Sequence, residues 1–164
     1  MTEATFVPGA ANARAFRDAL GRFPTGVTVV TAPGPEGPVG FTANSFASLS
    51  LDPPLVLWSP AKASLRHAVM VAAPFYSIHV LAEDQADLSG RFVRGGAGFA
   101  GLEIQTTPEG APAIPGTLAR FDCALHATHD GGDHTIVVGL VIRVHQGAGV
   151  PLVFCSGRYG RFSA

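Results

Sequence analysis

The chain has 164 residues, a formal net charge of −1 and only 14% charged residues, against 47% hydrophobic ones. This length suits one domain over 1–164, with 1–11 as a flexible tail. The sequence has no basic run that would attract nucleic acid or an anionic membrane, and no apolar run of the roughly 18–20 residues that cross a bilayer. Sparse surface charge on an apolar chain predicts a homodimer, which would cover exposed apolar area.

The N-terminus and the cysteines indicate the compartment. The first residues lack the basic segment and long apolar core of a signal peptide. Cys123 and Cys155 are the only cysteines, and both lie in apolar, strand-like runs. Because no Cys-x-x-Cys motif is present, we expect two reduced, buried thiols in a cytoplasmic protein.

The first third of the chain predicts a helix followed by strands. Residues 11–23 place their apolar side chains on one helical face. The β-branched residues of 26–32 predict a strand, and the proline- and glycine-rich 33–38 predicts a turn. A second strand begins at Val39, and the apolar run 54–59, bounded by prolines, predicts a buried strand.

The remaining elements follow from the same patterns. The expected strands cover 75–81, 118–130, 133–145 and 151–156, and the expected helices cover 63–73 and 82–92. Residues 93–104 are glycine-rich and predict an irregular connection, and Gly131-Gly132 predicts a two-residue hairpin. Strands separated mostly by turns indicate a mainly β fold, an antiparallel barrel with peripheral helices.

The segment "GFTANSFASLSL" (40–51) is unusual because its polar side chains are small and uncharged. As a continuous strand it would direct two sets of side chains to opposite faces. The polar face would hold Thr42, Asn44, Phe46, Ser48 and Ser50, and the core face Phe41, Ala43, Ser45, Ala47, Leu49 and Leu51. One interpretation is an edge or turn whose Ser and Asn bond the backbone; the other is a wall for a flat heteroaromatic ring. The pattern alone leaves both open.

Further along, "PAKASLRH" holds Lys62, the only lysine, close to Ser64 and Arg66. Ser64 would lie at a helix N-terminus, where free N–H groups and the helix dipole favour a phosphate. A capped helix with a solvated basic end is the alternative.

The sequence pattern gives weaker support to the remaining candidate site residues. Arg91 and Phe92 end a helix, where an arginine is ordinary. His126 and His129 would face opposite sides of a strand, so we expect no metal site. His134 follows the hairpin turn and could approach a ligand, or could be a plain surface histidine. Tyr159, between Arg158 and Arg161, could form a lip over a nucleotide or belong to a frayed end.

Five segments together resemble the flavin reductase-like proteins with an FMN-binding split barrel, the reductase components of two-component flavin monooxygenases. The segments are "FRDALGRFPTGVTVVT" (16–31), "GFTANSFASLSLDPPLVLWS" (40–59), "FYSIHVLAEDQADLSGRF" (75–92), "GDHTIVVG" (132–139) and "PLVFCSGRYG" (151–160). The resemblance implies a six-stranded antiparallel Greek-key split barrel and a homodimer, with FMN or FAD in a groove near the dimer interface.

The resemblance also implies residue roles. The flavin ring and ribityl chain would contact Thr42, Ala43, Asn44, Ser45, Ser48, Leu49 and Ser50. Lys62 and Ser64 would hold the flavin phosphate, with Arg91 and Phe92 near the phosphate and ribityl end. His134 would be the catalytic position beside the nicotinamide of NADH or NADPH, with Tyr159 and Arg161 near the same site. Because "ASLRH" offers one serine where relatives carry several, the choice between FMN and FAD stays open.

The implied activity is hydride transfer from NAD(P)H to flavin, which supplies reduced flavin to a partner monooxygenase. A protein for this reaction needs neutral donors near the flavin, because a carboxylate there would oppose the negative charge that develops. The segment has no carboxylate before Asp52. A flavin-binding electron carrier without turnover is the alternative, and a pyridoxamine-phosphate-type oxidase would need a more basic site.

Overall fold

The computed structural model describes residues 4–93 and 98–163, and its structure is mainly β with a few short helices. The helical elements are η1 (Ala10–Asn12), α1 (Ala13–Leu20), α2 (His67–Ala72) and α3 (Ala86–Arg91). The strands are β1 (Thr25–Gly26), β2 (Thr28–Gly34), β3 (Gly37–Ala43), β4 (Ala47–Leu51), β5 (Pro54–Trp58), β6 (Phe75–Val80), β7 (Gln105–Thr106), β8 (Pro112–Ala113), β9 (Ala119–Gly131), β10 (His134–Gln146), β11 (Leu152–Cys155) and β12 (Arg158–Arg161). Within this described part, no helix has the length and hydropathy of a membrane span.

Seven strands form the main sheet, in the order β3-β2-β6-β9-β10-β5-β4, and neighbouring strands are antiparallel. The expected sheet had six strands. The difference arises because the polar segment, expected as one strand, is two: β3 and β4 lie at opposite edges of the sheet. A separate three-stranded sheet joins β1, β11 and β12.

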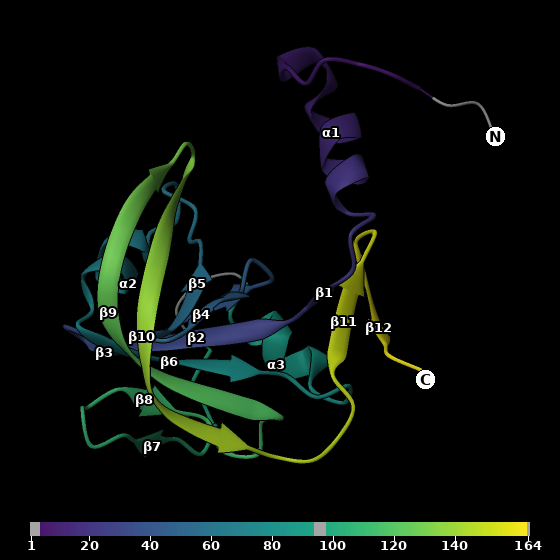
Figure 1. Cartoon of the computed structure of the whole chain (residues 1–164). Coiled ribbons are helices and arrows are strands. Elements are labelled where there is room, and N and C mark those ends of the chain that lie inside the picture. The colour runs from purple at the N-terminus through teal and green to yellow at the C-terminus, as the bar shows by residue number, and fades with distance from the viewer. Residues whose placement is uncertain (1–3, 94–97, 164) are drawn as a thin grey trace.

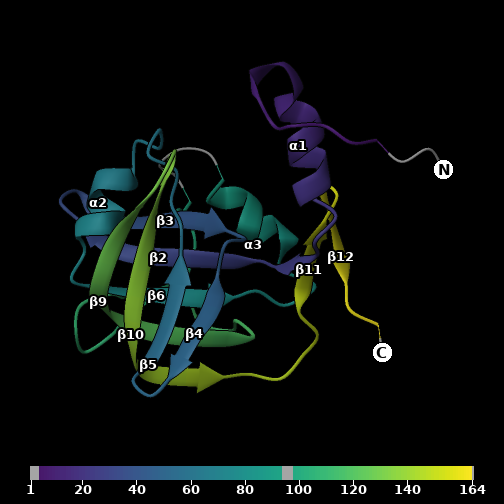
Figure 2. The ribbon, with the colours of Figure 1, turned by 45° about the horizontal axis from the view of Figure 1, so that its top comes forward.

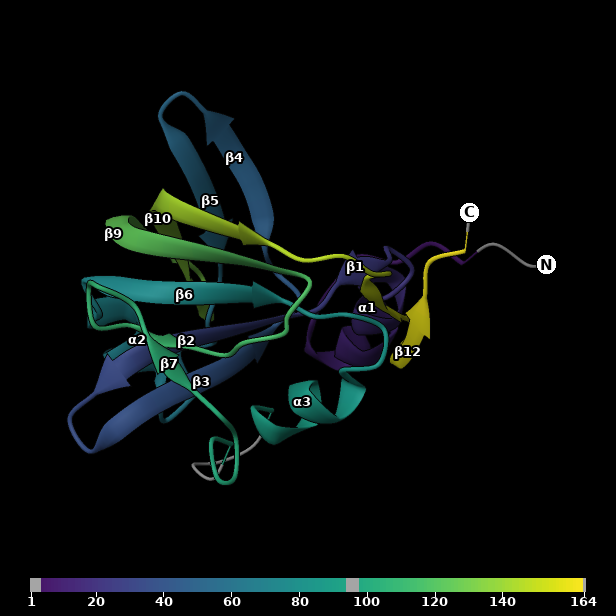
Figure 3. The same ribbon diagram turned by 90° about the horizontal axis from the view of Figure 1, so that it is seen from below.

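The sheet is strongly curled (Figures 1 and 3). In a flat sheet of seven strands the two edge strands would lie roughly 29 Å apart. Here the edge strands β3 and β4 are joined directly through residues 44–46. An extended chain from Ala43 to Ala47 spans at most about 14 Å. The two edges must therefore approach each other, which gives the sheet its barrel-like curl.

Strand β2 separates two apolar cores. Consecutive side chains of a strand face opposite ways, and Val29 and Val30 are both fully buried. Val30 packs inside the curl with Trp58 and Tyr76. Val29 packs on the other side with Leu81 and the ring of Phe92. The second core therefore holds α3 against the sheet, next to β3.

Helix α1 projects away from the sheet and buries none of its residues (Figures 1 and 2). Phe16, Leu20 and Phe23, the apolar face predicted from the sequence, are 42%, 59% and 76% exposed. The helix was placed correctly, but its apolar face does not contribute to the core of its own chain.

Three smaller expectations need correction. The hairpin turn is Gly132-Asp133, one residue later than expected, and Gly132 has φ +75°. A positive φ at the first central residue is what the favoured hairpin turns require, and it makes His134 the first residue of β10. Cys155 is half-buried, whereas Cys123 is buried as expected, and both thiols are free. Residues 158–161 form strand β12, which the sequence did not predict.

Two expected segments fall only partly in the described chain. Residues 1–3 of the tail expected over 1–11 lie outside the described residues. Residues 94–97 of the irregular connection expected over 93–104 also lie outside them.

His79 is a fully buried histidine on β6. Its Nδ1 lies 3.0 Å from the carbonyl oxygen of Val29, and its Nε2 lies 2.9 Å from the backbone nitrogen of Ile114. A carbonyl only accepts and a backbone N–H only donates, so Nδ1 carries the proton and Nε2 accepts. Burial lowers the pKa of His79 to about 4, so the ring is neutral in the folded protein.

This buried neutral histidine predicts acid sensitivity. In the unfolded chain His79 titrates near its ordinary pKa of about 6.5, so between pH 6.5 and 4 the unfolded state binds more protons. Stability is therefore full above pH 6.5 and falls as the pH drops towards 4. We expect the free energy of unfolding in urea to fall by about 2 kcal/mol between pH 7 and pH 5. His79→Gln should lose most of this dependence, whereas His126→Gln, at an exposed position, should keep it. An equal fall in all three proteins would contradict the assignment.

Candidate functional site

The polar segment 40–51 is interrupted at the point where the chain crosses between sheet edges. β3 ends at Ala43 and β4 begins at Ala47. The predicted alternation fails beyond this crossing: Leu49 and Leu51, expected in the core, are 50% and 95% exposed. The alternation of side chains between two faces applies only within one continuous strand. After the crossing a different set of side chains therefore faces the core.

Two hydroxyl side chains in this segment bond the main chain. Ser45 Oγ accepts the N–H of Ser59 at 2.9 Å and lies 3.3 Å from the carbonyl oxygen of Ser59. Thr42 Oγ1 donates to the carbonyl of Ser89 at 2.7 Å. For Thr42 and Ser45 the backbone-bonding interpretation is therefore the observed one. Both side chains lock the crossing to neighbouring elements.

The other residues expected at the flavin differ in exposure. Ala43 is buried, and its carbonyl accepts a hydrogen bond from Thr28 Oγ1 at 2.8 Å. Asn44 and Ser48 are exposed, and Ser50 is half-buried on β4. The side chains of Asn44 and Ser48 are thus accessible to a ligand.

Asn44 also lines a cavity of about 570 Å³ between the crossing and the α1–β11 region. Arg17, Arg22 and Phe23 line the same cavity from the N-terminal part of the chain, and Phe154 lines it from β11. Asp18 also lines this space. Its walls therefore carry neutral, cationic, anionic and aromatic groups, and it is large enough for a small organic ligand.

A chain of hydroxyl groups links β3, α3 and β12. Thr42 bonds the main chain of Ser89, and Ser89 Oγ lies 2.8 Å from the hydroxyl of Tyr159. The ring of Tyr159 packs on Phe154, with centroids 5.5 Å apart. The structure thus brings Thr42 and Tyr159, 117 positions apart in the sequence, to one place. Ser89 was not singled out from the sequence, because a serine inside a short helix carries no pattern of its own.

The expected helix start at Ser64 is wrong. Helix α2 begins at His67, and Ser64 lies in the turns before it, its Oγ accepting the N–H of Arg66 at 3.3 Å. Ala61 forms a β-bridge with His134, so the chain is held to the start of β10 and turns before it becomes helical. A phosphate at Ser64 would therefore meet turn backbone rather than a helix N-terminus.

Lys62 and His134 lie close together at the β9–β10 hairpin, as this bridge requires. The ammonium of Lys62 pairs with Asp130 and thereby lowers the pKa of that carboxyl. His134 Nδ1 lies 2.7 Å from a carboxylate oxygen of Asp133, and this contact lowers the pKa of Asp133. Lys62 and His134 thus each have a carboxylate partner. A bound phosphate would compete with Asp130 for Lys62.

Arg91 and Phe92 separate in space although they are adjacent in sequence. Arg91 is exposed and donates to the carbonyl of Ala100 at 2.8 Å. Phe92 is 2% exposed and packs edge-on against Phe99, with centroids 4.8 Å apart. The side chain of Arg91 is accessible, whereas Phe92 acts as a packed wall.

Arg66 holds this region together, a role that the sequence did not indicate. Its Nη1 donates to the carbonyls of Gly40 (2.7 Å) and Phe92 (2.9 Å), and its Nη2 donates to the carbonyl of Val93 at 3.2 Å. These bonds join the segment before α2 to β3 and to the end of α3. Burial lowers the pKa of Arg66.

The predicted site residues therefore form two groups. Thr42, Tyr159 and Phe92 meet around α3, while Lys62 and His134 meet at the hairpin. Arg66, four positions after Lys62, links the two groups. Ser48, Leu49 and Ser50 lie on β4, at the opposite edge of the sheet order from β3. Arg161 is exposed on β12, the strand that also carries Tyr159.

Comparison with known proteins assigns the family. The family described as the flavin reductase like domain matches residues 20–163. The chain belongs to this family. The resemblance seen in the five sequence segments is thereby confirmed.

Individual flavin reductases match over nearly the whole chain. SmoA from Agrobacterium fabrum, an FMN reductase (NADH), is 60% identical over 161 residues, covering 98% of this chain and 92% of that protein. HsaB from Mycobacterium tuberculosis, the reductase subunit of a flavin-dependent monooxygenase, is 43% identical, covering 89% of this chain and 80% of that protein. The solved structure of SgcE6, an NADH:FAD oxidoreductase of Streptomyces globisporus, has a TM-score of 0.89 at 36% identity, covering 100% of this chain and 95% of that one.

The hydroxyl chain through Ser89 gives a stability prediction. Tyr159→Phe leaves the fully buried Ser89 hydroxyl without this partner, so we expect a loss of about 1 kcal/mol in urea unfolding at pH 7. Tyr76→Phe is the matched control, because the buried Tyr76 hydroxyl has no hydrogen-bond partner among the described residues. Its removal should leave stability unchanged or raise it. Equal losses in both variants would argue against the link.

Proposed function

We propose that this chain is an NAD(P)H-dependent flavin reductase that reduces FMN or FAD and supplies the reduced flavin to a partner monooxygenase. In this proposal the curled sheet is the Greek-key split barrel of the family. The observation that carries the proposal is the meeting of Lys62 and His134 at the β9–β10 hairpin. One group suits a flavin phosphate and the other a nicotinamide, so both cofactors would be held at neighbouring points.

The residues around the crossing fit a flavin. Asn44 and Ser48 present exposed, neutral polar side chains, and Asn44 lines a cavity whose walls also hold arginine and phenylalanine side chains and Asp18. Segment 40–51 contains no carboxylate that would oppose negative charge on a reduced flavin. Lys62 would provide a cation for a phosphate that displaces Asp130 from its ammonium group. Thr42 and Ser45 would contribute indirectly, by holding the backbone of the crossing in place.

The bound cofactors themselves supply the hydride chemistry, from the nicotinamide to the flavin. The task left to the protein is to hold the two rings in contact, with the reacting atoms roughly 3–3.5 Å apart. His134 would serve this task by positioning the nicotinamide. Asp133 accepts a hydrogen bond from its Nδ1, so the second ring nitrogen, Nε2, is the one offered to the ligand. Tyr159 and Arg161 would approach the same site from β12.

A flavin carrier without turnover is the second candidate. It would need the flavin contacts but no group beside a nicotinamide. The Asp133–His134 pair favours the reductase, because an oriented imidazole has no task in a carrier.

The reductase and carrier proposals separate in one assay. We expect anaerobic mixing of the protein with FMN or FAD and NADH or NADPH to bleach the flavin absorbance. In steady state, His134→Ala should raise KM for the nicotinamide or lower kcat by about tenfold, because the nicotinamide loses its positioning contact. His129→Ala, on the same hairpin, is the control and should leave both constants near wild type. Flavin binding without bleaching would support the carrier instead.

We also propose that the chain forms a homodimer in the cytoplasm and passes reduced flavin to an oxygenase. The apolar face of α1 supports it, since Phe16, Leu20 and Phe23 are exposed, as is Phe162 near the C-terminus. A second copy would cover this face.

Light scattering after size exclusion tests the dimer. We expect a particle of twice 16.9 kDa for the wild type. Phe16→Asp/Phe23→Asp should shift it to a monomer, because two charges would be buried without partners. Arg14→Asp, on the same helix outside the apolar face, should remain dimeric. A monomeric wild type would refute the proposal.

A further inference from the structure

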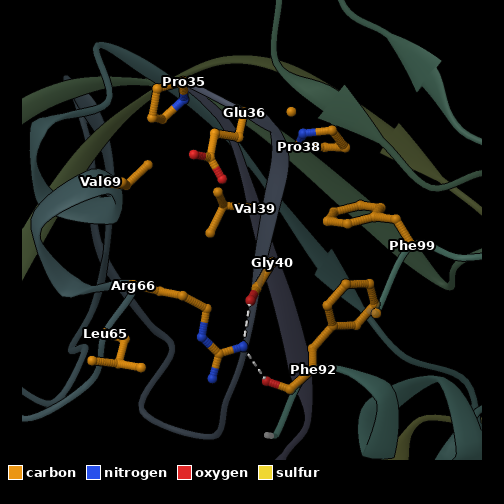
Figure 4. A pocket seen from close by; sticks show the side chains of 12 residues that line it. Pro35, Glu36, Pro38, Val39, Gly40, Leu65, Arg66, Val69, Phe92 and Phe99 are labelled. Atoms are coloured by element: carbon orange, nitrogen blue, oxygen red, sulfur yellow. Dashed lines mark hydrogen bonds between the residues drawn. The ribbon is translucent and has the colours of Figure 1, made fainter. Parts of the chain in front are cut away.

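A second cavity, of about 320 Å³, has Arg66 and Phe92 in its wall and has no ligand assigned to it so far (Figure 4). Its walls come from the β2–β3 turn, the segment before α2, and the region after α3. The lining includes Glu36, Val39, Arg66, Val69, Phe92 and Phe99. Its volume is at the lower end of the roughly 300–1,000 Å³ of ligand pockets, which suits one nucleoside-sized group.

The wall of this cavity adjoins the proposed phosphate end of the flavin site, because Ser64 Oγ accepts the N–H of Arg66 at 3.3 Å. Leu65 and Arg66, in its wall, directly follow Ser64. Phe92, in the opposite wall, directly follows Arg91. Gly40 also lines it, two positions before Thr42 on the same face of β3. A ligand whose phosphate lies near Lys62 and Ser64 could therefore extend past it into this cavity. FMN ends at its phosphate, whereas FAD continues with a second phosphate and an adenosine.

The walls suit a flat aromatic group. Arg66 uses donors at both Nη atoms on three carbonyls, and its guanidinium lies over the ring of Phe41, 5.1 Å from the centroid. A guanidinium fixed in this way can stack a base on its other planar face. Val39 and Val69 give apolar side walls. The Phe92 ring packs closely against Gly40 and Gly98, because a Cβ at either glycine would overlap it.

One polar group in the cavity favours adenine. Figure 4 shows the carboxylate of Glu36 directed between Val39 and Val69 into the cavity. A carboxylate accepts hydrogen bonds and donates none at neutral pH. It therefore matches the 6-amino group of adenine and repels the 6-oxo group of hypoxanthine.

We infer that this cavity binds the adenosine half of FAD, so that the chain binds FAD more tightly than FMN. The inference rests on the proposed flavin site. It adds a group of residues, Glu36, Val39, Arg66 and Val69, that the flavin ring and nicotinamide do not use.

Flavin binding to the full-length protein, followed by quenching of flavin fluorescence, tests the inference. We expect a lower Kd for FAD than for FMN. Val69→Phe narrows the cavity, and should raise Kd for FAD by about tenfold while Kd for FMN stays within about twofold. Ala68→Phe is the control, a larger enlargement at an exposed position of the same helix. It should change neither constant.

Two further measurements do not depend on that variant. AMP should compete with FAD for the wild-type protein but not with FMN, and IMP should compete more weakly than AMP. Glu36→Ala, at an exposed position, should raise Kd for FAD by about threefold and remove the preference for AMP over IMP.

Several results would overturn the inference. One is that FMN and FAD have equal Kd values both in the wild type and in Val69→Phe. Another is that AMP fails to compete with FAD. A raised KM for NADH in Val69→Phe, measured with FMN as acceptor and with Kd for FAD unchanged, would assign the cavity to the adenosine of NADH instead. Tight FAD binding without any NADH oxidation would leave the inference intact and refute the reductase activity. The binding and activity assays therefore separate the two claims.

Discussion

The three-residue crossing from β3 to β4 is the constraint on which the rest of this structure depends. It joins the first and last strands of a seven-stranded sheet, so the sheet must curl until its edges nearly meet. Ser45 stabilises the crossing through the main chain of Ser59, and Thr42 ties its start to α3. Small hydroxyl side chains suit this position, because they reach backbone groups of neighbouring elements: the N–H of Ser59 after β5 and the carbonyl of Ser89 in α3.

Arg66 extends this constraint to the ligand-binding region. Its guanidinium joins β3 to the end of α3, and α3 reaches β12 through Ser89 and Tyr159. The cavity beside Arg66 and the one beside Asn44 share no lining residue, but this network connects them: Arg66 lines the first, and Phe154, which packs on Tyr159, lines the second. A flavin reductase has to hold two cofactors in register, and such cross-links between distant segments provide that rigidity without a large body of secondary structure.

The charges are few, and Lys62 and His134 at the β9–β10 hairpin are each paired with a carboxylate. Lys62 faces Asp130, and His134 faces Asp133. These pairs are exposed, so each contributes little to stability and can be exchanged for a ligand at small cost. By contrast, His79 is buried and neutral, and its contribution to stability depends on pH. The chain thus separates accessible charges, suited to binding, from a buried polar group that fixes the fold.

The sequence by itself determined the strands around 54–58, 75–80 and 119–146, the mainly β class, and the family, because strand periodicity and local motifs are contained in neighbouring residues. It did not reveal that the polar segment breaks at 44–46, that α2 starts at His67, or that Ser89 and Arg66 connect the site. Only the tertiary structure decided these, since each depends on residues far away in the chain: the opposite sheet edge, the bridge from Ala61 to His134, and the carbonyls of Gly40 and Phe92. Hydrogen-bond partners at such separations leave no local pattern.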